Sequence, residues 1–275
     1  MIDEIVACLD GSEFAEAILP YAVGISRSLG AQLSLLRILE DGEAPAAAED
    51  YLKRIAGRHG AREKLRKSKG DAASAILDEL REKPLALAAM TTHGRTGMLE
   101  AILGSVAFRV VRGARRPILL YRPPAPLQAR SSDAEIKIAT VTAALDGQDF
   151  STRILPHAAE IASALKARLE LIQVLPSGGA EAEIPAELRR DVLESSYLQR
   201  EAHDITRKHG LEVDWEVLHG EPAEAIISYL KGRRNVLLAM TSHARLGLER
   251  TIFGSVAAEC LRRAGVPLLV YWPSP

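Results

Sequence analysis

Cysteine and net charge are both scarce in this sequence. Only two of its 275 residues are cysteines, Cys8 and Cys260, and the formal net charge at pH 7 is −1. So few cysteines exclude a small secreted domain held together by disulfides, and we expect each to be a small buried apolar residue. A chain this close to neutral lacks the basic surface of a nucleic-acid-binding protein.

Long apolar runs and familiar catalytic signatures are absent as well. No stretch approaches the roughly 20 apolar residues of a membrane span, so we expect a cytoplasmic protein with no membrane partner. The sequence contains no Walker A, GxGxxG or GxSxG pattern, and its seven histidines show no metal-ligand spacing. It therefore predicts neither a metal site nor an enzyme, apart from slow ATP hydrolysis at most.

An internal duplication is the strongest feature that is present. Three blocks recur in order: 9–11 as 145–147, 90–97 as 240–247, and 104–107 as 254–257. The first block recurs 136 residues later and the other two recur 150 residues later. Extra residues in the second copy, around 177–190, account for this difference. Blocks that keep their register over most of each half do not arise by chance, so the chain holds two copies of one domain.

A proline-rich stretch separates the two copies. Residues 122–126 (RPPAP) contain three prolines, and two serines follow at 131–132. Proline removes backbone donors and cannot continue a helix, so this segment is predicted to be an extended linker. We predict a first domain over 1–123, a linker over 124–134 and a second domain over 135–275.

Within each copy, apolar strand-like runs alternate with helix-period stretches. In the first copy the expected order is strand 4–9, helix 14–29, strand 33–39, helix 47–59, weak strand 61–69, helix 70–82, strand 85–91, a helix from 105 and strand 117–121. This alternation predicts an α/β protein of two doubly wound, Rossmann-like domains with parallel sheets. Because 61–68 is almost wholly polar, that segment is either a frayed edge strand or no strand.

Two strand ends and one helix start are candidates for a phosphate site. Asp10 follows the first strand, Thr91 ends the fourth, and Gly104 with Ser105 opens a helix. Ligands of open parallel sheets bind beyond the carboxyl ends of the strands, where the strand order reverses. The free N–H groups of a helix N-terminus favour an anion there, so these residues converge on a ligand if the two strands are neighbours.

The same residues resemble the signature of the universal stress protein family. The resemblance rests on TTHGRTG at 91–97, GSVA at 104–107 and a first strand that ends in LDGS at 9–12. It extends over nearly all of both halves.

The glycine pattern of the ATP-binding branch of that family is only partly kept. That pattern is Gly, two residues, Gly, nine residues, then Gly-Ser or Gly-Thr. Gly94, the nine-residue gap and Gly104-Ser105 match it, whereas Thr91 replaces the first glycine. In the second copy Thr241 and Ala244 replace both loop glycines.

The resemblance implies a stress-response protein with strand order 3-2-1-4-5 in each five-stranded parallel sheet. It implies pairing of the two domains through their last strands, and it leaves open a homodimer of tandem chains. It also implies that ATP or a related adenine nucleotide, with or without Mg²⁺, binds as a regulatory ligand. The implied residues of the first domain are Leu9, Asp10, Ile38, Met90, Thr91, His93, Gly94, Arg95, Gly104, Ser105, Val106 and Ala107. A more degenerate set in the second domain is Asp146, Thr241, Gly254, Ser255 and Val256.

On this resemblance, Asp10 contacts the adenine or ribose end, and the amides at Gly94, Ser105 and Val106 hold phosphates. Other interpretations stand beside it. Asp10 could simply cap the following helix, His93 could bond the backbone of its loop, and Arg95 could be a solvated surface residue.

Two functions therefore remain open. One is a nucleotide-regulated module in which the first half binds the ligand and the second has become structural. The other is a nucleotide-free pseudo-dimeric scaffold that acts through protein contacts.

Overall fold

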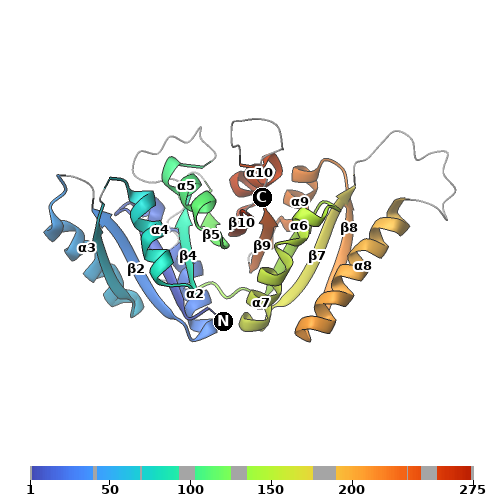
Figure 1. Cartoon of the computed structure of the whole chain (residues 1–275), viewed down its shortest axis with the longest axis horizontal. Helices are drawn as coiled ribbons and strands as arrows, with labels where there is room; N and C mark the ends of the chain where they lie inside the picture. Colours follow the sequence, from blue (N-terminus) through green and yellow to red (C-terminus); the bar gives the residue numbers. More distant parts are fainter. Residues whose placement is uncertain are drawn as a thin grey trace.

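The computed structural model describes residues 2–39, 42–68, 70–92, 103–124, 135–175, 190–233, 235–242 and 253–273. For residues 190–195 it describes the backbone alone. Most of the predicted linker and nearly all of the insertion at 177–190 lie outside these ranges. Figure 1 shows one long sheet with helices packed on both sides of it.

The first half alternates strands and helices as predicted. Its elements are β1 (Glu4–Leu9), α1 (Glu13–Glu16), α2 (Leu19–Leu29), β2 (Gln32–Leu39), α3 (Pro45–His59), β3 (Arg62–Lys67), α4 (Ala72–Glu82), β4 (Ala86–Thr91), α5 (Ser105–Gly113) and β5 (Ile118–Tyr121). The expected single helix over 14–29 is wrong in one respect, because it is two helices. Pro20 stands in the first turn of α2 and has no N–H to continue the hydrogen bonds of α1.

The second half repeats this order. Its elements are β6 (Thr140–Leu145), α6 (Asp149–Thr152), α7 (Leu155–Leu165), β7 (Arg168–Leu175), α8 (Arg190–His209), β8 (Val213–His219), α9 (Pro222–Leu230), β9 (Val236–Thr241), α10 (Ser255–Arg263) and β10 (Leu268–Tyr271). Here too a proline, Pro156, stands in the first turn of the second helix, so the break between the first two helices recurs.

The two halves form a single ten-stranded sheet of order β3-β2-β1-β4-β5-β10-β9-β6-β7-β8. Within each half the strands are parallel, and the predicted order 3-2-1-4-5 is confirmed. The halves meet at β5 and β10, which pair antiparallel from Ile118↔Val270 to Leu120↔Leu268. The predicted pairing through the last strands is therefore confirmed.

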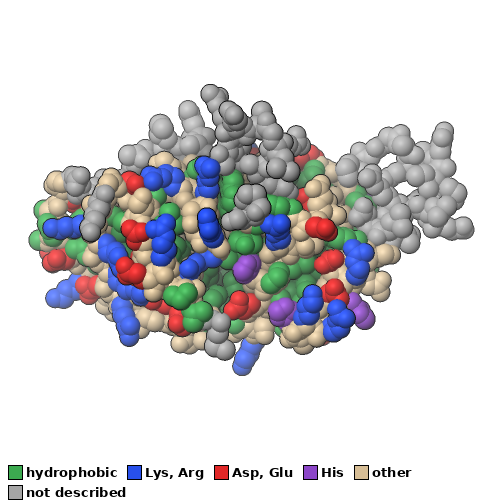
Figure 2. Space-filling view, in the orientation of Figure 1, with side chains coloured by type: hydrophobic (Ala, Val, Ile, Leu, Met, Phe, Trp, Pro, Cys, Tyr) green, Lys and Arg blue, Asp and Glu red, His purple; other side chains and the backbone are tan. Residues whose placement is uncertain are grey.

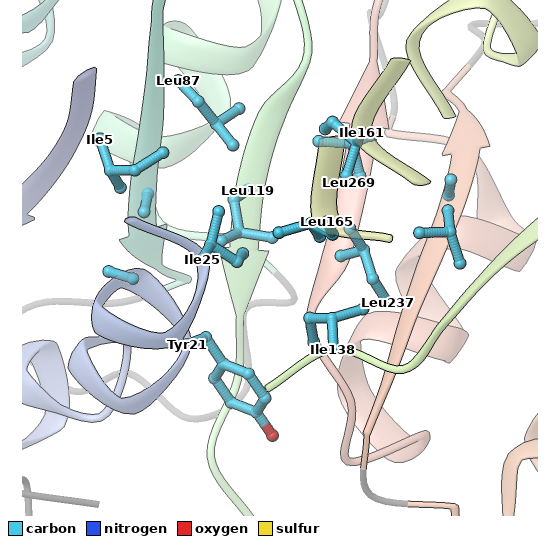
Figure 3. Packing of buried hydrophobic residues seen from close by; sticks show 14 of the residues in the cluster. Ile5, Tyr21, Ile25, Leu87, Leu119, Ile138, Ile161, Leu165, Leu237 and Leu269 are labelled. Carbon is cyan, nitrogen blue, oxygen red and sulfur yellow. The ribbon is translucent and has the colours of Figure 1, made fainter. Parts of the chain in front are cut away.

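Two apolar cores follow the faces of this sheet rather than its halves. One core contains residues of α2, α3, α7 and α8, and the other contains residues of α4, α5, α9 and α10. Figure 3 shows Leu119 of β5 and Leu269 of β10 packed in the first core with Ile25 of α2 and Leu165 of α7. Because each core runs across the β5–β10 junction, the two halves bury apolar surface against each other. The domain boundaries at 123 and 135 stay a prediction.

The chain that enters the second half lies against the first. The Ile136 N–H donates to the Pro20 carbonyl (3.0 Å), and Arg27 pairs with Glu135 (2.7 Å). A Cβ at Gly24 of α2 would lie 2.0 Å from the Ile136 carbonyl oxygen, so only glycine lets the two backbones come this close. Ile138 then enters the first core, where Figure 3 shows it beside Leu237.

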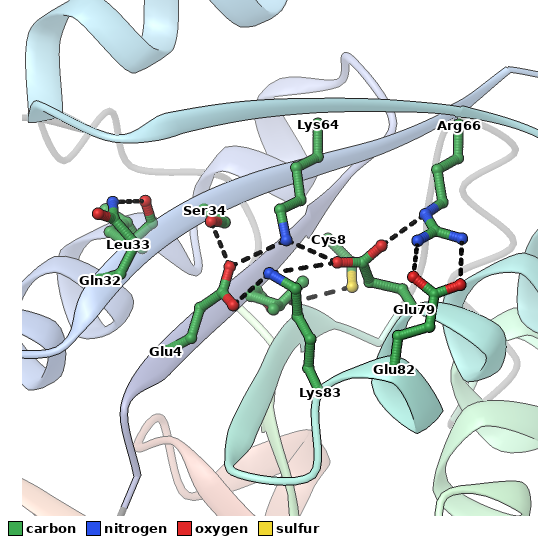
Figure 4. Close-up of polar contacts among 11 residues, drawn as sticks. Glu4, Cys8, Gln32, Leu33, Ser34, Lys64, Arg66, Glu79, Glu82 and Lys83 are labelled. Carbon is green, nitrogen blue, oxygen red and sulfur yellow. Dashed lines mark hydrogen bonds and ion pairs between the residues drawn. The ribbon is translucent and has the colours of Figure 1, made fainter.

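The polar segment at 61–68 does form an edge strand, β3, which pairs with β2 from Arg62↔Ser34 to Lys67↔Leu39. Its alternate side chains have different partners. Leu65 packs on the first core, whereas Lys64 and Arg66 contact the buried carboxylate of Glu79 on α4 at 2.6 and 2.5 Å (Figure 4). The strand is stable because the negative charge of Glu79 on α4 compensates the positive charges of Lys64 and Arg66.

A second carboxylate, Glu4 of β1, joins this cluster. Burial would raise the pKa of Glu4, but hydrogen bonds from Lys83, Ser34 and Lys64 hold its pKa below the usual value (Figure 4). The ionised form is therefore favoured in the folded state, and its contribution to stability is lost as the pH falls through the lowered pKa.

We expect Gly24→Ala to lower the free energy of unfolding by roughly 2 kcal/mol or more, because the new methyl group overlaps the Ile136 backbone. The matched control is Gly57→Ala in α3, where a Cβ meets nothing within 4 Å. That change should raise stability by about 0.5–1 kcal/mol, since alanine favours helix. Urea unfolding measures both, and equal effects would contradict the close approach.

We expect Glu79→Gln to destabilise the protein by about 3–5 kcal/mol, because Lys64 and Arg66 lose a buried counter-charge. Glu82 on the same helix pairs with Arg66 but is largely exposed, so Glu82→Gln should leave the unfolding midpoint nearly unchanged. The measurement is again urea unfolding at pH 7. A Glu79→Gln variant as stable as the native protein would show that the cluster does not stabilise β3.

Candidate functional site

The sheet splits at the carboxyl ends of β1 and β4. These strands are neighbours, but their pairing stops at Ala7↔Ala89. Beyond that point β1 continues with β2 as far as Leu9↔Arg37, and β4 continues with β5 as far as Thr91↔Tyr121. The strand order reverses here, so this opening is the crevice in which ligands of doubly wound sheets bind.

Asp10 stands at the mouth of the crevice and orders the turn that follows β1. Its carboxylate accepts hydrogen bonds from the Ser12 N–H (2.9 Å) and the Ser12 hydroxyl (2.6 Å). Ser12 is itself the N-cap of α1, since its oxygen accepts from the Ala15 N–H (3.1 Å). Capping is therefore done by Ser12, and Asp10 holds the cap in place while remaining half-buried.

The N-terminus of α5 lies at the end of β4. The Gly104 N–H donates to the Thr92 carbonyl at 2.7 Å, which fixes the start of the helix against the strand end. The N-cap residue Gly104 has no side chain to cap α5, no capping hydrogen bond is found among the described residues, and Ser105 is exposed. The first N–H groups of α5 and its positive dipole end are thus available to an anion.

An apolar wall adjoins this helix start. Met90 and Ala107 belong to the second core, and Ile38 and Val106 pack against it. Four of the predicted site residues are therefore brought to one face of the sheet. Leu9 is not among them, because its side chain lies in the first core on the opposite face. Only its backbone can face the crevice.

Thr91 also belongs to the opposite face. Side chains of a strand alternate, and Leu87 and Ala89 pack in the first core while Ala88 and Met90 pack in the second. Thr91 continues the row of Leu87 and Ala89 and is only 5% exposed. A β-branched residue there does not add bulk to the wall formed by Met90 and Ile38.

Sequence reasoning missed two residues beside Asp10. The buried Arg37 of β2 pairs with Glu43, and its guanidinium lies 5.7 Å from the ring centroid of Tyr51 on α3. Burial, then the charges of Glu16 and Asp10, raise the pKa of Tyr51. In the sequence, only an arginine within an apolar strand could have drawn attention to these positions.

The rest of the predicted first site lies outside the described residues. His93, Gly94 and Arg95 belong to the segment 93–102, and Ala244 belongs to the corresponding segment 243–252 of the second half. Their predicted contacts stay predictions.

The second half repeats the split but differs in its contents. Pairing of β6 with β9 stops at Ala143↔Ala239, while β9 continues with β10 to Thr241↔Tyr271. Asp146 is exposed, and its carboxylate accepts a hydrogen bond from the Gln148 N–H (3.0 Å). Gln148, at the position of Ser12, makes no side-chain capping hydrogen bond to α6.

The helix start of the second half is also altered. Gly254 donates to the Ser242 hydroxyl (3.1 Å), Ser255 is exposed, and Val256 packs against the second core. Phe253, at the position of Leu103 in the first half, is 7% exposed and belongs to that core. Leu103 is only partly buried against the same core, so the larger ring of Phe253 is packed more fully beside α10.

The family follows from a match along almost the whole chain. The family model described as the universal stress protein family matches residues 1–122 and again 137–271. The chain belongs to the universal stress protein family. It carries that family's domain twice, in tandem.

Several relatives support this assignment. A universal stress protein of Methanocaldococcus jannaschii is 31% identical over 130 residues, which cover 46% of this chain and 76% of that protein. One from Synechocystis sp. is 23% identical and covers 97% of this chain and 99% of its own length. The crystal structure of a universal stress protein from Archaeoglobus fulgidus matches with a TM-score of 0.70 at 18% identity, over 99% of each chain, which shows a shared fold.

Two further findings concern the described residues alone. None of their helices is both long and apolar enough to cross a membrane. No group of three or more His, Cys, Asp or Glu side chains among them could hold a metal ion.

The two cysteines should be inert in the native protein. Cys8 lies in β1, next to the crevice, and Cys260 lies in α10. Burial raises the pKa of each thiol to about 12. Since the thiolate is the reactive species, we expect neither to react with a maleimide at pH 7. Both should react in urea, as read by intact mass. Rapid native labelling of Cys8 with Cys260 unlabelled would show that the crevice opens to the core.

Proposed function

We propose that this universal stress protein binds an adenine nucleotide, ATP by preference, in the crevice of its N-terminal half. The nucleotide acts as a regulatory ligand in a stress response. The C-terminal half serves as the structural partner. Hydrolysis is not part of the proposal, because no base-and-nucleophile pair is found among the described residues of the crevice.

One observation carries the proposal. The N-terminus of α5, whose N-cap Gly104 has no side chain and where Ser105 is exposed, follows β4 at the split in the sheet, and Asp10 follows β1 at the other side of that split. Free backbone N–H groups and a hydroxyl suit phosphate oxygens, and a carboxylate suits the hydroxyls of a ribose. The apolar wall of Ile38, Met90 and Val106 suits the flat face of a base.

The position of Thr91 agrees with this function. Its side chain lies on the face of Leu87, away from the wall that would contact the base. The replacement of the family's first glycine is therefore compatible with an open site. Mg²⁺, if it accompanies the nucleotide, would be held mainly by the phosphates, with Asp10 as a nearby protein carboxylate.

A nucleotide-free scaffold is the second candidate. The observation in its favour is the continuous sheet with two shared cores, which gives the tandem chain a built-in pair of domains. The same arrangement leaves the edge strands β3 and β8 at the outside, where a second chain could meet it. Absence of nucleotide binding would favour this function.

The first experiment is thermal unfolding with and without excess ATP, beside mass analysis of any nucleotide that copurifies. A ligand at 100 times its dissociation constant stabilises by about 2.7 kcal/mol, which a raised midpoint reveals. Gly104→Val should abolish the rise, because a branched side chain crowds the backbone that approaches phosphate.

The matched control is Gly254→Val, at the same position of the second half, which should retain the ATP-dependent rise. Asp10→Asn keeps the acceptor for Ser12 but removes the charge, and it should weaken binding roughly tenfold. Equal losses from Gly104→Val and Gly254→Val would contradict a first-half site. No rise in the native protein would reject nucleotide binding altogether.

A further inference from the structure

A cavity of about 170 Å³ lies between the start of β4 and α7, so both halves of the chain line it. We call it the junction pocket. Figure 2 shows a hollow with apolar side chains around it, in the middle of the near face. The pocket is separate from the crevice, because it adjoins the amino ends of β4 and β5 and the crevice lies at the carboxyl ends of β1 and β4.

Most of the wall of the junction pocket is apolar. Leu87 of β4 and Ile161 of α7 are buried in the first core, and Ile2 packs against that core. An apolar cavity of about 150 Å³ accommodates a benzene molecule. The volume here is therefore enough for a short alkyl group and below the roughly 300–1,000 Å³ of pockets for drug-sized ligands.

An exposed leucine stands at the rim. Leu85, 49% exposed, and Trp215, 40% exposed, are the large apolar side chains that stand out on the surface of the described residues. Trp215 belongs to the edge strand β8, whereas Leu85 lines the junction pocket. Exposed apolar surface beside an apolar hollow is typical of a ligand-binding site.

One guanidinium lines the pocket, and no carboxylate among the described residues pairs with it. The Nη1 of Arg116 donates to the main-chain oxygens of Lys83 (2.8 Å) and Pro84 (3.1 Å), which holds the side chain in place. Burial lowers the pKa of Arg116, so its charge is partly desolvated without a counter-ion. The other N–H donors of an arginine fork match the two oxygens of a carboxylate.

The remaining polar side chains of the pocket are already engaged. His157 packs edge-on against Tyr271 at 4.8 Å between ring centroids, and burial lowers its pKa, so the ring is an uncharged wall at pH 7. Glu160 is exposed and has an interaction partner of its own. Its negative charge disfavours a second acidic group on a ligand. Arg116 is therefore the one group left to select the charge of a ligand.

We propose that the junction pocket binds a short aliphatic monocarboxylate. Its carboxylate pairs with Arg116, and its alkyl group packs on Ile2, Leu87 and Ile161 beneath the rim residue Leu85. A pocket of this volume holds an acid of about four to six carbon atoms. The ligand contacts both halves of the chain and so strengthens their junction, and its binding does not depend on a nucleotide in the crevice.

The test compares isocaproate with isocaproamide, which has the same shape and no charge. Methyl NMR titration of the full chain should show isocaproate shifting the Ile2, Leu87 and Ile161 signals. Isocaproamide should bind at least about tenfold more weakly, because the charge-assisted contact to Arg116 is lost. Acetate should also bind at least about tenfold more weakly, because it leaves the apolar wall uncovered.

Variants assign the two parts of the site. Arg116→Gln should remove the advantage of isocaproate over isocaproamide. Arg112→Gln, at an exposed position of α5 outside the pocket, is its matched control and should keep that advantage. Leu85→Ala should weaken isocaproate binding about threefold or more, since apolar contact is lost at the rim. Trp215→Ala removes the other exposed apolar side chain and should leave the binding unchanged.

Should Arg116→Gln fail to fold, the comparison of acid and amide on the native chain, with Leu85→Ala at its exposed position, still decides the question. The proposal is overturned if isocaproate shifts none of the three methyl signals. It is also overturned if isocaproamide or acetate binds the native chain as tightly as isocaproate does.

Discussion

The antiparallel ladder between β5 and β10 is the contact on which the rest of the molecule depends. Three residue pairs, from Ile118↔Val270 to Leu120↔Leu268, join two five-stranded sheets into one. Without it, each half would expose a hydrogen-bonding edge and the apolar faces beside it. The ladder places α2 against α7, and it lets both cores continue across the junction. Because both partners belong to one chain, the pairing is intramolecular and does not depend on protein concentration.

A shared core explains how the two halves could diverge. Each half is stabilised in part by the other, so changes at one crevice do not remove the support of the sheet. The first half keeps Asp10 held by Ser12, whereas the second has an exposed Asp146 and a buried Phe253 beside its helix start. The charged cluster on the second face also differs between the halves. In the second half, Tyr229 and Arg233 stand where the first half has Glu79 and Lys83, and both donate hydrogen bonds to Glu170 of β7.

Much of the fold could be predicted because short-range patterns of apolar, turn and cap residues determine where the strands and helices lie. Apolar runs bounded by Gly, Asp and Pro locate the strands, and the repeat locates the second domain. The prediction was undecided at β3, which could have been an edge strand or no strand, and wrong at the single helix expected over 14–29. The polar segment of β3 is a regular strand because Glu79 compensates Lys64 and Arg66, and Glu79 lies on a later helix. The break between α1 and α2 reflects Pro20, which the apolar period of 14–29 hides.

The sequence by itself determined the duplication, the alternation of strand and helix, and the placement of Asp10, Gly104 and Ser105 at element ends. These depend on residue spacing and on local turn and cap chemistry, which a chain carries before it folds. Only the tertiary structure decided that β1 and β4 part after Ala7, because that split is a property of pairing between strands far apart in sequence. It also decided that the chain entering the second half packs on α2 at Gly24, since the close approach of Ile136 exists only once the two halves are folded against each other.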